Sequence, residues 1–305
     1  MRHAFLIIAH SNWWQLKQLI MLLDDESHDI YVHIDKKSHD FNFGMLQGLT
    51  KKSCLECFQE YKVYWGGYSQ VQAEMLLFEQ SYRKGYDYYH ILSGMDLPLK
   101  PNAEIHYFFE QHKGKEFISY DEDKLESDSE IGRRTRLYHF LQNYRRNFKS
   151  KWINAFFTFF ERGLLVIQII LHVNRVKNLD WVIKYGSNWV SITNELVEVL
   201  LRQKGKIEKV FSYTNCADEL FVQTVAHNCG FQNSIYKGNM RLVDWERGSN
   251  GNPYTFRISD FKTLQNSDAL FARKFSEAVD KDIIWKVISE LQKEKVFRNV
   301  ERTRG

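Results

Sequence analysis

The chain has 305 residues, a formal net charge of +4, 44% hydrophobic residues and 26% charged residues. These proportions are those of a folded globular protein, so disordered, collagen-like and low-complexity classes are excluded. The charge is too weak for a nucleic-acid coat protein, and 4 cysteines are too few for a disulfide framework in a chain this long. An aromatic content of 15% with 3 prolines favours ligand grooves lined by aromatic rings.

The first residues are predicted to begin a doubly wound α/β sheet. Residues 4–9 form an apolar run typical of a buried strand, too short for a signal peptide or a membrane span. Apolar residues then recur at helical spacing from 13 to 23, and a second strand is predicted at 29–35. Because ligands bind beyond the carboxyl ends of strands in such sheets, His10 and Asp35 are candidates for one nucleotide crevice.

Two further units of strand and turn follow. Residues 62–68 are predicted as a strand closed by a glycine pair, and a capped helix is predicted over 69–82. Residues 88–92 are predicted as a strand that ends in a turn over 93–99, and this turn presents the Asp96 carboxylate. An Asx turn before Pro98 is the alternative explanation for Asp96.

The middle of the chain is acidic between 121 and 130 and basic between 133 and 151. Residues 152–173 are almost entirely apolar, but Glu161, Arg162 and Gln168 interrupt the run, so it falls short of the ~18 uninterrupted apolar residues of a membrane span. We predict an amphipathic pair of helices packed in the core. Peripheral contact with an anionic membrane is the alternative.

The last part of the chain holds two pairs of charged residues. Strands are predicted at 185–192 and 210–214, each followed by a helix. Asp218 and Glu219 open the second of these helices, where they fit either a catalytic pair or a helix cap with Asn215. Arg273 and Lys274 are adjacent cations that could neutralise a diphosphate without a metal, and a solvated basic surface is the alternative. The sequence has no P-loop and no G-x-G-x-x-G motif, so nucleotide hydrolysis and dinucleotide redox chemistry lack support.

Together these segments resemble the core-2/I-branching β-1,6-N-acetylglucosaminyltransferases, glycosyltransferase family 14, and the related peptide O-xylosyltransferases. The resemblance extends over nearly the whole chain and rests on segments in the family order at 6–10, 32–38, 65–67, 92–99, 186–189, 218–219, 243–245 and 271–275. It implies an α/β fold of the GT-A type, with a Rossmann-like mixed central sheet flanked by helices, as a single domain over 1–305. Residues 1–119 would be the nucleotide-sugar-binding half, and residues 120–305 the acceptor-binding half with the catalytic base and a diphosphate-binding C-terminal part.

The resemblance implies an inverting transfer from a UDP-sugar to a hydroxyl of a glycan or glycoconjugate. It assigns the donor to a set of seven residues, which are His10, Asp35, Trp65, Gly66, Asp96, Arg273 and Lys274. Glu219 would be the catalytic base, and the acceptor side would consist of Asp218, Trp189, Trp245 and Arg241. The second carboxylate of an Asp-x-Asp motif is absent beside Asp96, so no metal is expected, and Arg273 and Lys274 would offset the charge on the leaving UDP.

The donor sugar is expected to be GlcNAc, with xylose as the alternative, because no residue distinguishes them. Animal members of the family carry an N-terminal anchor, a stem and several disulfides, whereas this chain starts at its first strand. We therefore expect a cytoplasmic bacterial enzyme of polysaccharide biosynthesis that acts on a glycan or lipid-linked glycan. Peripheral contact with the inner face of the membrane through 152–173 stays the alternative to core packing.

Two other classes of protein remain as alternatives. A non-catalytic carbohydrate-binding protein would keep the aromatic residues but would not need Glu219, Arg273 and Lys274 in one crevice. A nucleic-acid binder would use the basic middle of the chain, but the neighbouring acidic residues oppose a phosphate-binding groove. No nucleic-acid partner is expected.

Overall fold

The computed structural model describes residues 1–121, 129–144, 148, 150–249 and 251–302. Residues 122–128 of the acidic stretch, and residues 145–147 and 149 of the basic stretch, lie outside the described residues.

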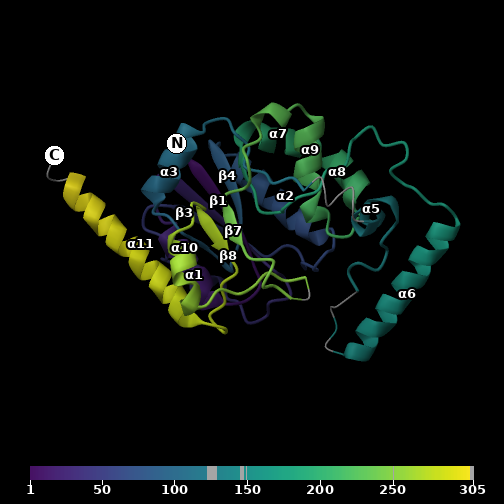
Figure 1. Ribbon diagram of the computed structural model, residues 1–305, viewed down its shortest axis with the longest axis horizontal. Helices are drawn as coiled ribbons and strands as arrows, with labels where there is room; N and C mark the ends of the chain where they lie inside the picture. The colour runs from purple at the N-terminus through teal and green to yellow at the C-terminus, as the bar shows by residue number, and fades with distance from the viewer. Residues whose placement is uncertain (122–128, 145–147, 149, 250, 303–305) are drawn as a thin grey trace.

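The main sheet has five strands in the order β3-β2-β1-β4-β6 (Figure 1). Four of them are parallel, namely β1 (His3–Ala9), β2 (His28–Ile34), β3 (Cys54–Phe58) and β4 (Tyr88–Ser93). The fifth, β6 (Ser191–Thr193), is antiparallel to β4. The carboxyl ends of the parallel strands therefore meet at one edge, and we call this the carboxyl edge. The predicted Rossmann-like mixed sheet flanked by helices is confirmed.

Helices cover both faces of this sheet, because its strands are apolar on both sides. Alternate strand residues such as Phe5 and Ile7 pack toward α1 (Trp13–Leu22) and α3 (Asn102–Gln111). On the other face Leu6 and Tyr31 pack toward four helices, which are α2 (Ser69–Tyr82), α7 (Asn194–Arg202), α8 (Lys204–Phe211) and α9 (Phe221–Asn228).

A second sheet has three short strands in the order β5-β8-β7. These strands are β5 (Asp96–Pro98), β8 (Phe271–Arg273) and β7 (Arg241–Val243). They share a third apolar core with α10 (Phe261–Gln265) and α11 (Lys281–Arg302). In the β5–β8 pair Asp96 is directly opposite Arg273, although 177 residues separate them in the chain. Each sheet therefore contains strands from both predicted halves. The remaining short helices are η1 (Phe43–Leu46), α5 (Ser129–Arg136), η2 (Ala217–Glu219), η3 (Gln232–Ser234) and η4 (Ile258–Asp260).

Three of the predicted strands require correction. Residues 62–68 form a loop and turn, because the backbone N–H groups of Val63 and Tyr64 donate to the side chains of Asp35 and Ser69 rather than to a strand. Residues 210–211 end helix α8, and the predicted strand at 185–192 is reduced to β6. Short apolar runs fit a buried helix as well as a strand, so their periodicity did not separate the two.

The predicted pair of core-packed helices is also wrong. Residues 151–170 form a single helix, α6 (Lys151–Ile170), which stands apart from the rest of the protein (Figure 1). Its two buried residues are polar, Glu161 and Gln168, whereas Trp152 is 87% exposed. Among the described residues, α6 is the one helix that is long and apolar enough to cross a membrane by length and composition.

Candidate active site

The first part of the site lies where β1 and β2 end at the carboxyl edge. The Asp35 carboxylate accepts hydrogen bonds from the backbone N–H groups of Lys37 at 2.9 Å and Val63 at 3.1 Å, so it is fixed in place. Desolvation lowers the pKa of His10; Asp35 opposes this shift, and the positive charge of Lys274 adds to it. The predicted donor residues His10, Asp35 and Lys274 therefore lie within electrostatic reach of one another.

The second part of the site is an ion pair within the second sheet, between its neighbouring strands β5 and β8. Asp96 is 1% exposed, and its two oxygens accept from Arg273 Nη1 at 2.8 Å and from the Ser93 N–H at 2.9 Å. The Arg273 guanidinium also lies 4.2 Å from the centre of the Trp189 ring. Lys274, by contrast, forms no ion pair within the described part of the chain. Of the two cations Arg273 and Lys274, Lys274 is therefore the one that remains available to an anionic ligand.

The third part of the site joins the Gly66 turn to the acidic pair. The Gln70 side chain accepts from the Gly66 N–H at 2.7 Å and donates to Asp218 Oδ2 at 3.1 Å. Gly66 has a φ of 72°, and a Cβ there would lie 3.0 Å from Asn215 Oδ1, so only glycine fits without strain. The turn and the acidic pair are thus held together by one amide side chain.

Asp218 and Glu219 differ in their access to solvent. Asp218 is buried, and burial raises its pKa to about 7, with Glu219 adding to the shift. The Glu219 side chain is 29% exposed, and its Oε2 accepts from Arg134 Nη1 at 2.9 Å. Glu219 is therefore the member of the pair that a substrate can reach.

The helix-cap alternative stays open, because Asp218 and Glu219 lie in the first turn of the short helix η2. Cys216 precedes the short helix η2 and makes no capping side-chain hydrogen bond, and α9 begins only at Phe221, after Glu219. The Glu219 carboxylate accepts a hydrogen bond from the Arg134 side chain of α5.

Residues 186–189 connect the acidic pair to the cationic pair. Asn188 donates to Asp218 Oδ2 at 3.3 Å, and the next residue, Trp189, stacks on Arg273. The Gly186 N–H donates to the Glu219 carbonyl at 2.9 Å. One short segment therefore contacts a member of each charged pair.

The remaining predicted residues occupy different surroundings. Trp65 and Trp245 are 52% and 59% exposed, so their rings are available to a ligand. The Arg241 guanidinium donates to Ser191 Oγ at 2.8 Å and to the Val190 carbonyl at 2.9 Å, and desolvation lowers its pKa to about 9. Arg241 therefore ties β7 to the main sheet, and this placement argues against the acceptor-side role predicted for it.

Sequence reasoning missed two residues of α2, Gln70 and Glu74. Glu74 is 1% exposed, and its Oε2 has no hydrogen-bond partner among the residues that the structure describes. Burial raises its pKa well above the usual range, and Asp218 adds to the shift. Glu74 shares the apolar face of α2 with Val71, Met75 and Phe78. The sequence did contain a signal for Glu74, because a carboxyl group within the apolar stripe of a predicted helix indicates a buried acid.

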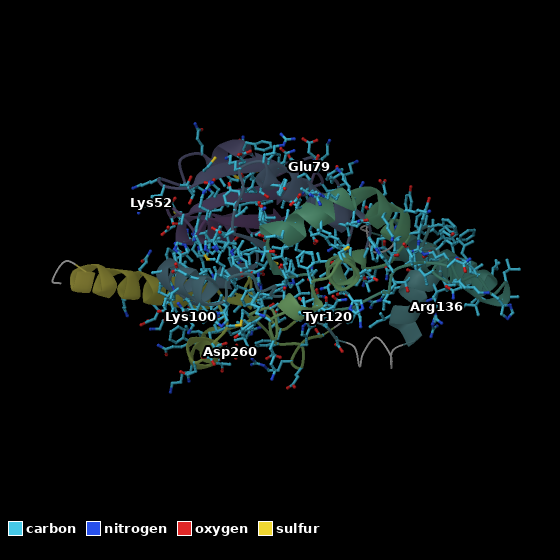
Figure 2. All side chains as sticks on the ribbon, turned by 90° about the horizontal axis from the view of Figure 1, so that it is seen from above. Lys52, Glu79, Lys100, Tyr120, Arg136 and Asp260 are labelled. Atoms are coloured by element: carbon cyan, nitrogen blue, oxygen red, sulfur yellow. The ribbon has the colours of Figure 1, made fainter. Side chains whose placement is uncertain are left out.

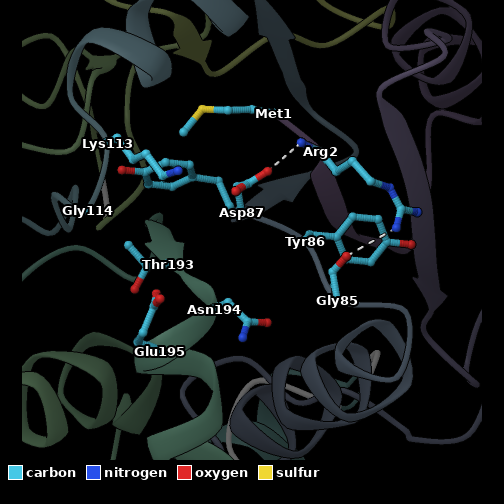
Figure 3. Close-up of a pocket in the computed structure, with 11 residues that line it drawn as sticks. Met1, Arg2, Gly85, Tyr86, Asp87, Lys113, Gly114, Thr193, Asn194 and Glu195 are labelled. Atoms are coloured by element: carbon cyan, nitrogen blue, oxygen red, sulfur yellow. Dashed lines mark hydrogen bonds between the residues drawn. The ribbon is translucent and has the colours of Figure 1, made fainter.

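The edge of the main sheet opposite the carboxyl edge has a pocket and a small cluster of histidines. A pocket of about 380 Å³ opens there, and its lining contains none of the predicted site residues (Figure 3). On the same edge Asp25, His28 and His106 place one potential metal ligand each within 4.8 Å of one another. The Nε2 atoms of His28 and His106 are 2.5 Å apart, nearer than two nitrogens bound at about 2.0–2.1 Å to one tetrahedral zinc ion. The two histidines therefore form a hydrogen-bonded pair.

The fold and the residues described above define a class: an α/β protein that places cations and a carboxylate pair near the carboxyl ends of its parallel strands. The model of the Core-2/I-Branching enzyme family matches residues 3–266. The chain therefore belongs to the Core-2/I-Branching enzyme family.

Curated relatives include xylosyltransferase 2 of Rattus norvegicus, 22% identical over 317 residues, and xylosyltransferase 2 of Homo sapiens, 23% identical over 314 residues. Each match covers 93% of this chain and 33% of the relative, so the chain spans about a third of the length of these proteins. The crystal structure of mouse xyloside xylosyltransferase 1 in its apo form matches 89% of this chain and 96% of its own, with a TM-score of 0.38 and 12% identity. That likeness is too low to carry an argument.

Proposed function

We propose that the chain is an inverting glycosyltransferase that moves a sugar from a UDP-sugar to a hydroxyl of a glycan or glycoconjugate. Membership of the family supports this proposal. The observation that carries it is the contact of residues 186–189 with both charged pairs, through Asn188 to Asp218 and through Trp189 to Arg273. A leaving diphosphate needs cations and an acceptor hydroxyl needs a base, and the site supplies both groups.

Glu219 is the proposed base. It takes the proton of the acceptor hydroxyl while the acceptor oxygen attacks the anomeric carbon of the sugar, and the bond from that carbon to the UDP oxygen breaks on the opposite side. A single displacement of this kind inverts the anomeric configuration and needs no second nucleophilic carboxylate. Asp218, which is buried, holds the segment that carries Glu219 through its bonds to Gln70 and Asn188.

Lys274 is the proposed partner of the diphosphate, and Arg273 supports it from beside Asp96. Both oxygens of Asp96 already accept hydrogen bonds, from Arg273 and from the Ser93 N–H. A divalent ion prefers a shell of several free oxygens, so Asp96 in this arrangement is a poor metal ligand. We therefore propose that fixed cations stabilise the leaving UDP and that the reaction needs no metal.

The proposed donor is UDP-GlcNAc. A specific observation favours UDP-xylose as the second candidate, because the similar curated proteins bear the name xylosyltransferase. The proposed acceptor is a lipid-linked glycan on the cytoplasmic side of a membrane.

A panel of UDP-sugars tests these proposals, with release of UDP measured with and without EDTA. We expect one sugar to dominate and the rate to survive chelation. Loss of turnover in EDTA with recovery in Mn²⁺ would refute the metal-free proposal. If no donor releases UDP with any glycan acceptor while glycans still bind, the chain is a carbohydrate-binding protein and the enzymatic proposal fails.

A further inference from the structure

The exposed side of helix α6 is apolar, whereas the two buried residues of this helix, Glu161 and Gln168, are polar. Trp152, Phe156, Phe159, Val166 and Ile170 follow one another at spacings of 3, 4 or 7 residues, so they form one stripe along the helix. Each of these five side chains is more than half exposed. An amphipathic helix of a water-soluble domain normally turns such a stripe toward the core. The stripe on α6 therefore faces outward.

The polar side of α6 is anchored to the protein by specific hydrogen bonds. Glu161 accepts from the Leu141 N–H at 3.1 Å and contacts His139 Nδ1 at 3.1 Å. Gln168 accepts from the Tyr138 N–H at 2.8 Å and donates to the Tyr138 carbonyl at 3.0 Å. Glu161 and Gln168 lie seven residues apart, and therefore on the same face of the helix. These bonds fix the rotation of α6 and leave the apolar stripe outward.

The anchoring loop is itself part of the globular body. The His139 N–H donates to the Tyr213 carbonyl at 3.0 Å, and the Gln142 side chain donates to the Ser212 carbonyl at 2.6 Å. If α6 crossed a bilayer, Glu161 would have to enter the hydrocarbon or lose these partners, and an unpaired buried carboxylate is very unfavourable. The geometry therefore fits a helix that lies along a surface.

The stretch of sequence that contains α6 is strongly cationic. Glu161 is the one acidic residue between 131 and 177, and this interval contains ten lysine and arginine residues. Lys151 and Arg162 are exposed on α6 beside the apolar stripe, where long side chains can reach headgroup phosphates while their stems stay apolar. Arg136, at the end of α5, lies on the same side of the molecule (Figure 2). Negatively charged lipid is the complementary partner for this combination.

We propose that α6 is a monotopic membrane-binding helix, which lies in the interface of an anionic membrane with its apolar stripe among the acyl chains. The stripe supplies the apolar contact, and the basic residues supply selectivity for anionic lipid. This proposal goes beyond the proposed function, and it does not require that the chain be an enzyme.

The position of α6 also relates the membrane to the site. Helix α5 leads into the anchoring loop 138–141, and Arg134 of α5 contacts Glu219 at 2.9 Å. A membrane that holds α6 is thus connected through one helix and one loop to the proposed base. This orientation rests on the proposed function, and it favours an acceptor that is attached to lipid.

Flotation of the full chain with lipid vesicles tests the membrane proposal. The vesicles contain phosphatidylcholine alone or phosphatidylcholine with 30% phosphatidylglycerol. The double variant F156S/F159S removes part of the stripe, and Y107S is the matched control, because Tyr107 is 65% exposed on α3 and belongs to no proposed site. A second variant, R162Q, removes one cation beside the stripe.

We expect the wild type and Y107S to bind the anionic vesicles at least tenfold more strongly than the neutral ones. F156S/F159S should lower this binding more than tenfold, and R162Q about fivefold, with unchanged melting temperatures.

Equal binding to both vesicles, or no binding at all, would overturn the proposal. A dimer in solution that F156S/F159S dissociates, without vesicle binding, would assign the stripe to a second copy of the chain. Resistance to extraction at alkaline pH would assign α6 to a membrane span. UDP release is measured on the same samples, so failure of the membrane proposal and failure of the proposed function remain distinguishable.

Discussion

Replacing Glu219 with glutamine separates a catalytic carboxylate from a structural ion pair. Glutamine keeps the size of the side chain and an oxygen that Arg134 can bond, but it cannot accept the acceptor proton. The ion pair is 29% exposed on the Glu219 side and 19% on the Arg134 side. Partly exposed pairs contribute about 0.2–1 kcal/mol, so the free energy of unfolding should change by no more than about 1 kcal/mol. Removing a general base should lower the turnover rate about 10²–10⁴-fold.

The assay measures UDP release with acceptor and the melting temperature on the same purified protein. Glu198→Gln is the control, because Glu198 forms an ion pair with Arg202 on the surface of α7 and belongs to no proposed site. We expect the control to show a similarly small change in stability and an unchanged rate. UDP affinity should remain at the wild-type level in both variants. A Glu219→Gln enzyme that is as fast as the wild type would refute the assignment of the base.

Three further predictions concern the diphosphate, acid stability and chain packing. Lys274→Ala should lower UDP affinity in calorimetry by roughly 1.5–3 kcal/mol, since one charge-assisted contact is lost, and an unchanged affinity would remove Lys274 from the site. Burial lowers the pKa of His33 to about 4, and the unfolded value is about 6.5, so the unfolded chain binds the proton first as the pH falls. Its contribution to stability is complete above pH ~6.5 and declines toward pH 4. Between pH 7 and 5 the wild type should therefore lose about 2 kcal/mol more than His33→Gln in urea unfolding, and an equal loss in the two proteins would contradict this reasoning. A Cβ on Gly186 would lie 1.8 Å from the Ser119 carbonyl oxygen, so Gly186→Ala should destabilise the fold by more than about 3 kcal/mol. A Cβ on Gly163 would have nothing within 4 Å, so Gly163→Ala should stabilise α6 by about 0.5–1 kcal/mol. Equal melting temperatures of the two variants would contradict this reasoning.

Local sequence patterns were sufficient to predict a helix or strand where the buried residues of that element recur at its regular spacing. The apolar runs at 4–9, 29–35 and 88–92 form three neighbouring strands of the main sheet, and the helical spacing over 69–82 forms α2. Periodicity predicts these elements because it records which side of each element is buried. The same signal failed at 62–68, where backbone groups bond to side chains of other segments.

The residues proposed for the site were visible as motifs, but their partners were not. Asp96 and Arg273 are 177 residues apart, Gln70 and Asp218 are 148 apart, and Arg134 and Glu219 are 85 apart. Such pairs form only when the topology of the fold brings distant segments together, so spacing along the chain carries no sign of them.

The sequence by itself determined the order of the α/β elements, the polar residues at the ends of strands and the apolar character of residues 152–173. The tertiary structure alone decided which side of α6 meets the protein, because composition is the same for a core helix and for an exposed one. Two polar residues, Glu161 and Gln168, settled that question through their hydrogen bonds to residues 138–141. These two groups can be buried because residues 138–141 satisfy their hydrogen bonds, so their face of the helix meets the protein and the apolar stripe lies outside.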